Sequence, residues 1–205
     1  VRMLIVAGEP GGSIESIRRR IESAWGARVI DHWGMTELGP MAVECSEQPG
    51  GMHVLETECI AEIIEPGSGE PVPAGATGEL VITTLGRTGS PLFRFRTGDL
   101  VTAATGDCRC GLSLLRLEGG ILGRLDDMLT IRGNNVYPAS LEAILRAIDD
   151  VVEYRIEVRT EREMDHVRIE VEPAAGADAD RLANEVGRQV KDRLNFQVDV
   201  VAVEP

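Results

Sequence analysis

The twenty residues 123–142 constrain the fold more than any other part of the sequence, because they predict the entrance to a second domain. A polar opening is followed by an apolar segment, Met128–Ile131, which is typical of a short strand, and then by a Gly-Asn-Asn loop. Glycine and asparagine tolerate left-handed backbone, so this loop favours a turn. Pro138 then begins a helix, with Glu142 near the positive end of its dipole.

The residues before this stretch predict one βαβ unit followed by a β-rich region. An apolar strand, Met3–Val6, precedes a helix over residues 13–25 with isoleucines on one face, and a second strand, Ala27–Ile30, follows. Strands joined by a crossover helix are parallel. Strand patterns then dominate residues 51–122, and one of them, Cys59–Ile64, ends at a Pro-Gly-Ser-Gly turn.

The residues after the entrance predict a compact α+β domain. Two closely joined strands lie between two helices, and a last strand follows the second helix. This order, preceded by a short hairpin, favours a ferredoxin-like sandwich. The predicted elements are helices over 139–148 and 179–195 and strands over 154–158, 167–171 and 198–203.

Composition excludes several classes of partner. The net charge of −13 argues against nucleic acid and anionic membranes. The sequence has no apolar run long enough to span a bilayer and no signal-peptide pattern, so we expect a cytoplasmic protein. Four cysteines without a secretory signal indicate free thiols or metal binding rather than disulfides.

The segment Asp31–Gly39 follows the second strand of the βαβ unit. It predicts a glycine-flanked loop that carries the hydroxyl of Thr36 and the carboxylate of Glu37 at the carboxyl end of the strand. Open α/β sheets bind ligands at that edge. The alternative is an ordinary loop in which Thr36 caps a helix.

A second segment, 91–99, predicts another polar site. It predicts a strand over Leu92–Phe95 that continues toward Gly98. Alternation places Arg94 and Arg96 on one face of this strand and Phe93 and Phe95 on the other. A turn at Gly98 would then present Asp99, and a carboxylate is a natural acceptor for two vicinal hydroxyls. The alternative is an aspartate that only forms the turn.

Three cysteines and one histidine flank the same β-rich region. Cys108 and Cys110 form a tight pair whose sulfurs could face one point, because Gly111 allows the chain to turn. With Cys45 and His53 they would complete a tetrahedral structural zinc site of three thiolates and one imidazole. The alternative is four unrelated residues, with His53 on the surface.

These motifs, in this order, resemble those of the adenylate-forming acyl-CoA ligases, in the version carried by the phenylacetate–CoA ligases. The resemblance covers essentially the whole chain. It implies an α/β plus α+β fold: the end of a parallel-sheet subdomain, a small distorted β-barrel and a ferredoxin-like C-terminal domain. The implied parts are a portion of the large nucleotide-binding domain over 1–122 (βαβ unit 1–40, barrel about 51–122), a hinge over 123–127 and a small mobile domain over 128–205.

The resemblance also implies the chemistry of the first motif. Such ligases use ATP and an acid to form an acyl-adenylate, and the thiol of CoA then displaces AMP. Thr36 would touch the α-phosphate and Glu37 would help to hold Mg²⁺, while Trp33 would lie along the adenine. Trp33 departs from the commoner tyrosine or phenylalanine, and a flat ring is retained. The other residues implied in this nucleotide loop are Asp31, Gly34 and Met35.

The remaining implied contacts come from other motifs. Asp99 would bind the ribose, and Arg124 would contact ribose and phosphate. Asp126 would be the pivot of the hinge, and Gly133 would face the pantetheine tunnel in the thioester-forming state. A Gly-Glu-Pro turn would lie against adenine and ribose; its residues are Gly8, Glu9 and Pro10. Relatives of this kind commonly carry the same cysteine and histidine set.

Two expected features of such ligases are missing from the sequence. No Ser/Thr/Gly-rich phosphate loop precedes the first strand, and Lys191, which is the sole lysine, does not match the C-terminal lysine motif. We therefore expect a ligase fragment that is inactive alone, from a parent that uses an aryl acid, ATP and CoA; homodimer formation is left open. The alternatives are an adenylyltransferase that stops at AMP transfer and a non-catalytic nucleotide- or effector-binding module.

Overall fold

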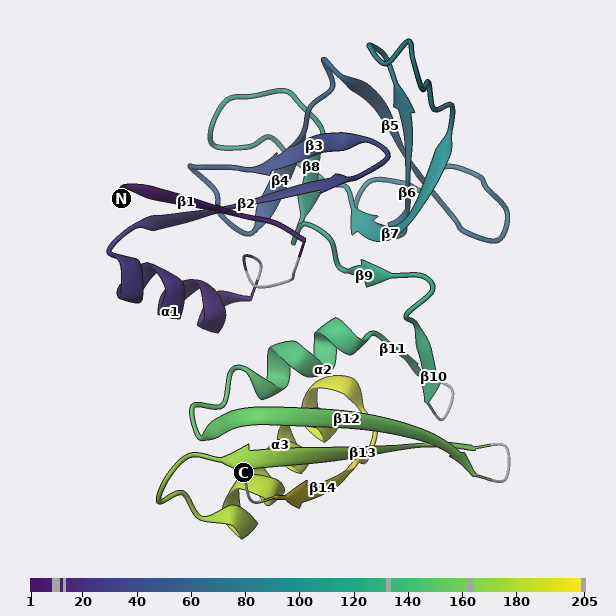
Figure 1. Ribbon diagram of the computed structural model, residues 1–205. Coiled ribbons are helices and arrows are strands. Elements are labelled where there is room, and N and C mark those ends of the chain that lie inside the picture. The colour runs from purple at the N-terminus through teal and green to yellow at the C-terminus, as the bar shows by residue number, and fades with distance from the viewer. Residues whose placement is uncertain (9–11, 13, 132–133, 162–163, 204–205) are drawn as a thin grey trace. The chain divides into compact units, whose positions relative to one another are not determined.

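The computed structural model describes residues 1–8, 12, 14–131, 134–161 and 164–203 of the chain (Figure 1). These residues form two compact units, Val1–Asp126 and Asp127–Pro205. The boundary between the units falls within the predicted hinge segment 123–127. Among the residues described, no helix is long and apolar enough to cross a membrane.

A five-stranded sheet begins the first unit. Its first two strands are parallel and are joined by a helix, which confirms the predicted βαβ unit. The other neighbouring pairs are antiparallel. In spatial order the strands are β1 (Met3–Val6), β2 (Arg28–Met35), β3 (Gly39–Glu44), β4 (Gly51–Val54) and β8 (Arg116–Glu118), and the helix is α1 (Glu15–Trp25).

Helix α1 differs from its prediction in what it buries. Ile14 occupies the N-cap position without a side-chain cap, and Gly26 ends the helix with φ 56°. Ser13, the first residue of the predicted helix, lies outside the described residues. The isoleucines are half-buried, and the buried residue of the helix is Arg18.

A four-stranded antiparallel sheet completes the first unit. Residues from both sheets share one core cluster, which includes Trp33, Val54, Leu80 and Val101. An isolated bridge between Ala103 and Leu117 also joins them. The region predicted as a barrel is therefore two sheets over one core. The strands, in spatial order, are β5 (Cys59–Ile64), β6 (Thr77–Thr84), β7 (Phe95–Thr102) and β9 (Gly123–Arg124).

The predicted loop Asp31–Gly39 is wrong in its extent. β2 continues through Met35 and pairs with β3, so the connection is a tight hairpin around Thr36 and Glu37. The strand continues because an antiparallel partner follows directly in the sequence, and Trp33 pairs with Ala42 in that partner.

The predicted strand over 92–95 is also wrong in its limits. β7 begins where that strand was expected to end, and Arg94 before it has left-handed backbone with φ 45°. Gly98 does not end the strand: it has φ 76° inside β7, where the register with β6 shifts. A bulge of this kind requires left-handed backbone, which glycine tolerates.

The second unit contains the predicted order of elements. A hairpin, β10 (Leu129–Ile131) and β11 (Asn134–Val136), precedes the helix, and the remaining strands form a three-stranded sheet. β12 and β13 are antiparallel, and β13 and β14 are parallel. The remaining bounds are α2 (Pro138–Leu145), β12 (Val151–Glu161), β13 (Met164–Pro173), α3 (Ala179–Leu194) and β14 (Asp199–Ala202).

The sheet of this unit differs from that of a ferredoxin-like sandwich. In that fold the strand before the first helix lies within the main sheet, whereas here β10 and β11 pair with each other. β14 can therefore pair directly with β13. Asn134 and Asn135, which were predicted as part of a loop, belong to β11 and pair with Ile131 and Thr130.

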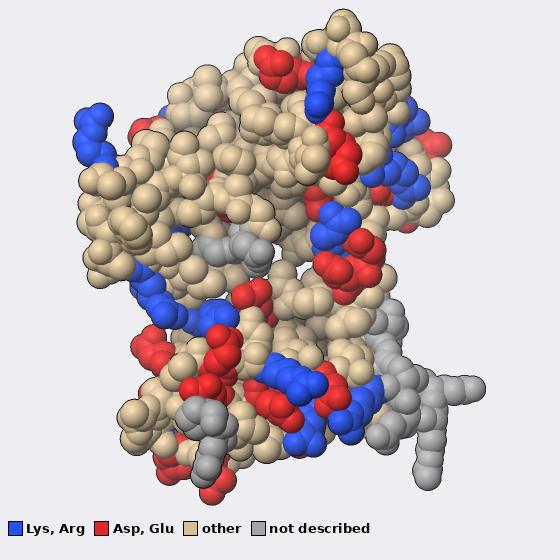
Figure 2. All heavy atoms as spheres, viewed as in Figure 1, with Lys and Arg blue, Asp and Glu red and all other residues tan. Residues whose placement is uncertain are grey.

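Helix α3 supplies an apolar stripe to the core of the second unit. Leu182, Val186 and Val190 are buried at helical spacing and cluster with buried β13 residues such as Ile169. Asp178 caps the helix by accepting a hydrogen bond of 3.0 Å from the backbone N–H of Arg181. On the face in Figure 2, acidic and basic side chains are interspersed over the molecule.

Candidate functional site

Three sequence motifs meet around the buried carboxylate of Asp99. The indole N–H of Trp33, in β2, donates a hydrogen bond of 2.9 Å to Oδ2 of Asp99, in β7. Nη1 of Arg124, in β9, lies 3.4 Å from Oδ1 of the same carboxylate. Arg124 in turn donates two hydrogen bonds to Asp126, of 2.9 and 3.1 Å. The structure therefore brings together the nucleotide-loop motif, the predicted ribose acid and the hinge motif.

Burial raises the pKa of an acid in this cluster, and hydrogen bonds from Arg124 or Trp33 lower it. Asp99 is only 4% exposed, and this desolvation raises its pKa against the effects of the Trp33 hydrogen bond and the Arg124 charge. The hydrogen bonds from Arg124 lower the pKa of Asp126. A carboxylate oxygen can accept more than one hydrogen bond, so Asp99 retains capacity for hydroxyl donors.

Gly98 has a steric role that the sequence analysis missed. A Cβ at this position would lie 3.2 Å from Nη2 of Arg124 and 3.9 Å from Oδ1 of Asp126. Glycine therefore adopts the left-handed backbone of the bulge and also leaves room for the Arg124 guanidinium beside Asp99. The local pattern Thr97-Gly98-Asp99 predicts a turn that presents Asp99, and it does not indicate the bulge.

The predicted phosphate and magnesium residues lie at the tip of the β2–β3 hairpin. Thr36 and Glu37 are exposed there, and Arg87 donates a hydrogen bond to the backbone carbonyl of Glu37. Gly34 is required just before the tip, because a Cβ on it would lie 2.4 Å from the carbonyl oxygen of Gly39. Met35 is half-buried at the end of β2.

Trp33 is more enclosed than a stacking role alone would require. Its side chain belongs to the core cluster, and the residue is 8% exposed. Its contact with adenine stays a prediction.

Asp31 belongs to a buried polar network that the sequence analysis missed. Glu44 accepts hydrogen bonds from the backbone N–H of Asp31, at 3.0 Å, and from Arg18, at 2.6 Å. Arg18 also donates to the carbonyl of Gly12, with Nη2 at 2.7 Å. Burial, followed by the nearby charge of Glu44, raises the pKa of Asp31 to about 6. One signal was available: Arg18 lies at helical spacing within the apolar stripe that includes Ile14 and Ile21.

The turn after β1 is described only in part. Gly8 has φ 83° and is exposed at the end of that strand. Glu9, Pro10 and Gly133 lie outside the described residues, so their predicted contacts stay predictions.

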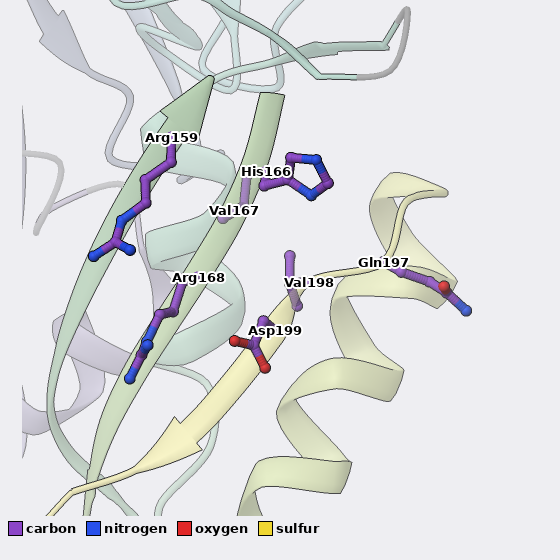
Figure 3. Close-up of a pocket in the computed structure, with 7 residues that line it drawn as sticks. All are labelled: Arg159, His166, Val167, Arg168, Gln197, Val198 and Asp199. Atoms are coloured by element: carbon purple, nitrogen blue, oxygen red, sulfur yellow. The ribbon is translucent and has the colours of Figure 1, made fainter. Parts of the chain in front are cut away.

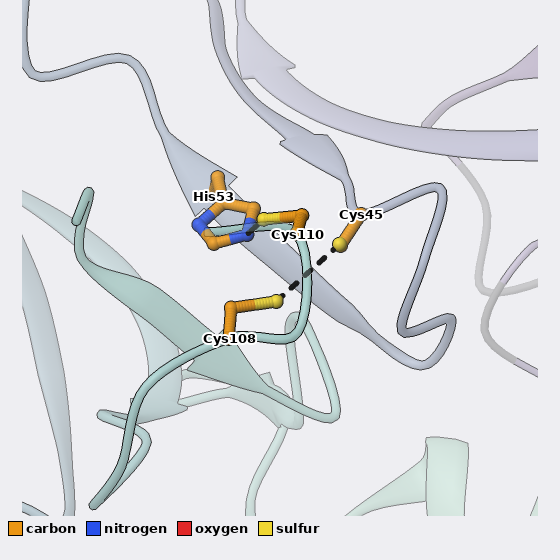
Figure 4. A group of neighbouring side chains, drawn as sticks. All are labelled: Cys45, His53, Cys108 and Cys110. Carbon is orange, nitrogen blue, oxygen red and sulfur yellow. Dashed lines mark hydrogen bonds between the residues drawn. The ribbon is translucent and has the colours of Figure 1, made fainter. Parts of the chain in front are cut away.

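The predicted metal ligands converge on one point (Figure 4). The ligand atoms of Cys45, His53, Cys108 and Cys110 all lie within 4.8 Å of one another. Sγ of Cys45 lies 3.4 Å from Sγ of Cys108, and Sγ of Cys110 lies 3.3 Å from Nε2 of His53. Ligand atoms around tetrahedral zinc are about 3.5–3.8 Å apart, given zinc–sulfur bonds of about 2.3 Å. The donor set and its spacing therefore fit zinc.

Nearby backbone groups prepare this cluster for a metal. Nδ1 of His53 lies 3.4 Å from the carbonyl oxygen of Leu114, so a proton on Nδ1 would leave Nε2 free to coordinate. The backbone N–H of Cys110 is the main cause that lowers the pKa of Cys108. Gly111 has φ 77°, the left-handed turn that the sequence predicted after the cysteine pair.

A separate pocket lies on the three-stranded sheet of the second unit (Figure 3). Arg159, His166 and Arg168 line it together with Asp199. The two arginines form ion pairs with glutamates on their own strands, so the charge of the pocket is largely balanced within the sheet. It contains none of the residues that the sequence analysis selected.

Comparison with known proteins agrees with the resemblance of the motifs. Residues 133–205 match the family described as the AMP-binding enzyme C-terminal domain. The chain is 36% identical to the phenylacetate–coenzyme A ligase of Thermus thermophilus, and the match covers 93% of this chain and 47% of that protein. The chain is homologous to the phenylacetate–CoA ligases. It spans about half the length of these relatives.

The fold matches solved ligase structures. The 2-hydroxyisobutyryl-CoA ligase in its postadenylation state, in complex with 2-HIB-AMP, has a TM-score of 0.92 and 33% identity, and the match covers 100% of this chain and 45% of that one. The same ligase in its thioesterification state, with 2-HIB-AMP and CoA, has a TM-score of 0.59. The TM-score of this one chain falls from 0.92 to 0.59 between the two states. The matched part of that ligase therefore has a different conformation in each state.

Proposed function

We propose that this chain is part of an AMP-forming acid–CoA ligase, with phenylacetate or another aryl acid as substrate. The complete protein would form an acyl-adenylate and pyrophosphate from the acid and ATP, and CoA would then displace AMP to give the acyl-CoA. The observation that carries the proposal is the buried carboxylate of Asp99, which is held between Trp33 and Arg124. The homology of the chain to phenylacetate–CoA ligases supports it.

In this proposal, catalysis depends mainly on charged and polar groups held in fixed positions around the nucleotide. Asp99 would accept hydrogen bonds from the ribose hydroxyls, and Arg124 would contact ribose and phosphate. Thr36 would touch the α-phosphate, and Glu37 would help to hold Mg²⁺, which supplies positive charge to the phosphates. Phosphate transfer depends on positioning and electrostatic stabilisation, and groups on rigid strands and a short hairpin are suited to both.

Asp126 is the proposed pivot between the two half-reactions. Its side chain is 66% exposed and the residue ends the first unit, so its backbone torsions can change without disturbing a core. The two states of the 2-hydroxyisobutyryl-CoA ligase support a conformational change in this part of the family.

We also propose that Cys45, His53, Cys108 and Cys110 hold a structural zinc ion. All four positions of a tetrahedral ion would be occupied by protein, so the ion would have no open position for a substrate. Its function would be to fasten the chain after β3 and the loop between β7 and β8 to the same sheet.

Nucleotide binding by variants of Asp99 tests the proposed site. We expect Asp99→Ala to weaken AMP binding about ten- to a thousandfold, because charge-assisted bonds to the ribose are lost. Asp99→Asn should have an intermediate effect, since it keeps the shape and one acceptor oxygen. Isothermal titration of AMP into each protein is the measurement, and Glu70→Ala, at an exposed turn of the same unit, is the control. AMP affinity unchanged in both Asp99 variants would contradict the assignment.

The reaction that the complete protein catalyses is tested separately, in a longer protein that includes this chain. A CoA ligase would consume CoA and yield a thioester. An adenylyltransferase would transfer AMP without forming a thioester, and a non-catalytic module would do neither.

A further inference from the structure

Arg116 is a buried cation beside the proposed metal centre. It lies in β8 directly opposite His53 in β4, and its side chain is only 4% exposed. The guanidinium occupies the space above Gly51, where a Cβ would come within 2.3 Å of Nη2. A glycine at position 51 therefore makes room for this arginine.

The hydrogen bonds of Arg116 connect it to the chain segment that carries Cys45. Nη2 donates to the backbone carbonyl of Gln48, at 3.4 Å. The side-chain oxygen of Gln48 in turn lies 3.7 Å from Sγ of Cys108 and 3.5 Å from the backbone N–H of Arg109. The arginine and a metal-ligand cysteine thus contact the same residue.

The charge of Arg116 is not fully balanced by the described protein. Nη1 donates to the carboxylate of Glu118, but that carboxylate is 56% exposed and is therefore screened by water. The buried Nε has no hydrogen-bond partner among the described residues.

A zinc ion in this site would create a matching negative charge. Three thiolates and a neutral imidazole around Zn²⁺ carry a net charge of −1. Three of the four ligand residues are buried, and a buried charge is costly unless an opposite charge lies nearby. Among the residues described around the cluster, Arg116 is the buried group with the opposite sign.

We propose that Arg116 is the counter-cation of the metal centre, a positioning residue that favours zinc held by three thiolates over the empty site. The inference rests on the proposed zinc site and adds to it a residue that does not touch the metal. Arg116 would act through its charge, which offsets the anionic cluster, and through Gln48, which holds the chain next to Cys45.

A double-mutant cycle separates charge from packing. Arg116→Met removes the charge and keeps an apolar side chain of similar length, and Cys110→His converts the anionic cluster into a neutral one of two thiolates and two imidazoles. Zinc affinity is measured for the four proteins by competition with a chromophoric chelator. We expect Arg116→Met to weaken zinc binding about ten- to a hundredfold in the natural ligand set, and to change it within about twofold in the Cys110→His background.

Two further variants keep the test decisive. Arg116→Lys retains the charge and should bind zinc within about tenfold of the wild type and more tightly than Arg116→Met. Glu118→Gln removes the partner carboxylate but keeps the cation, so zinc affinity should not fall. If Arg116→Met is insoluble, the comparison of Arg116→Lys with Arg116→Gln at low and high salt replaces it, and only the loss in the glutamine variant should depend on salt.

The outcomes distinguish the proposed zinc site from the proposed role of Arg116. Equal losses of zinc affinity in both backgrounds, or lysine and glutamine variants that bind equally weakly, would show that Arg116 acts by packing and would overturn the inference alone. A wild-type chain without measurable zinc affinity would overturn the metal site and the inference together.

Discussion

Asp31 shows how burial alters a single residue of the candidate site. Its carboxyl lies in a strand beside the carboxylate of Glu44, and Gly12 packs so closely that a Cβ there would lie 2.5 Å from Cγ of Asp31. Desolvation and the Glu44 charge both favour the protonated acid, which gives the pKa of about 6. An acid with this pKa changes its charge near neutral pH, so the residue links folding to pH.

We expect Asp31→Asn to be more stable than the wild type at pH 7–8, by at most about 3 kcal/mol. The pKa in the folded state, about 6, is above the value of about 3.9 in the unfolded chain. The folded state therefore binds more protons between these values, and the stability contributed by protonated Asp31 is lost as the pH rises through 6. Asparagine cannot ionise, so the difference between the two proteins should shrink to near zero at pH 4.

Urea unfolding from pH 4 to pH 8, followed by circular dichroism, provides the measurement. A stability difference that does not change with pH would show that Asp31 is ionised in the folded protein throughout this range. Glu70→Gln, an exposed acid of the same unit, controls for the general effect of charge.

At the scale of elements, the loops around the proposed metal have little packing of their own. Residues 105–111, between β7 and β8, are polar or glycine apart from the two cysteines, and the exposed ones include Thr105, Asp107 and Arg109. Such a segment buries too little apolar surface to offset the entropy of ordering it. Its order must therefore come from the metal ligands and from the hydrogen bonds around Gln48.

Removal of the metal should loosen residues 41–53 and 105–112 and leave the second unit, from Asp127 onward, folded. Structural zinc sites can contribute about 10–16 kcal/mol of binding free energy, part of which orders the loops. Hydrogen exchange before and after chelation, with elemental analysis of each sample, measures the effect. Exchange that rises equally in both units, or zinc far below one per chain in untreated protein, would contradict this expectation.

The hinge prediction concerns the connection between the two units. In a longer ligase that includes this chain, Asp126→Pro should damage one half-reaction and spare the other, because proline fixes φ at the pivot. Asp126→Asn keeps the backbone free and is the matched control. Adenylation is measured by ATP–pyrophosphate exchange, and thioester formation is measured separately from preformed acyl-adenylate. Equal losses in both half-reactions would argue against a pivot at this residue.

At the scale of the whole molecule, the chain contains the groups that we propose for nucleotide binding but covers only about half of its relatives. A nucleotide site needs further contacts to phosphates and acid before it can catalyse adenylation. The 205 residues contain no Ser/Thr/Gly-rich phosphate loop of the expected kind.

The 205-residue chain on its own should therefore give no ATP–pyrophosphate exchange with phenylacetate or a panel of aryl acids. Exchange above a no-protein blank would contradict this expectation. A full-length phenylacetate–CoA ligase assayed under the same conditions shows that the assay can detect activity.

Local patterns predicted much of this structure. Apolar periodicity located α3 and the strands around it, and the tight pair of Cys108 and Cys110 predicted a cluster that the structure brings together. These features depend on residues close in the sequence or on chemically distinctive side chains. They need no knowledge of which strands become neighbours.

Features that depend on distant pairing were missed. Local apolarity predicts that the second strand ends at Ile30, but β2 continues to Met35 because it pairs with β3. The turn predicted at Gly98 is a bulge, which exists only because β7 pairs with β6. The ion pair of Arg18 with Glu44 joins a helix to a strand 26 residues away in the sequence. No local pattern specifies such partners.

The two tryptophans give the molecule an optical probe of its own. Trp33 is buried with its N–H on Asp99, whereas Trp25, at the end of α1, is 62% exposed. Acrylamide would quench the emission of the exposed indole first and leave the signal of the enclosed one. A nucleotide that draws the Asp99 carboxylate toward its own hydroxyls would shift that remaining emission, so occupancy of the site could be followed without any added label.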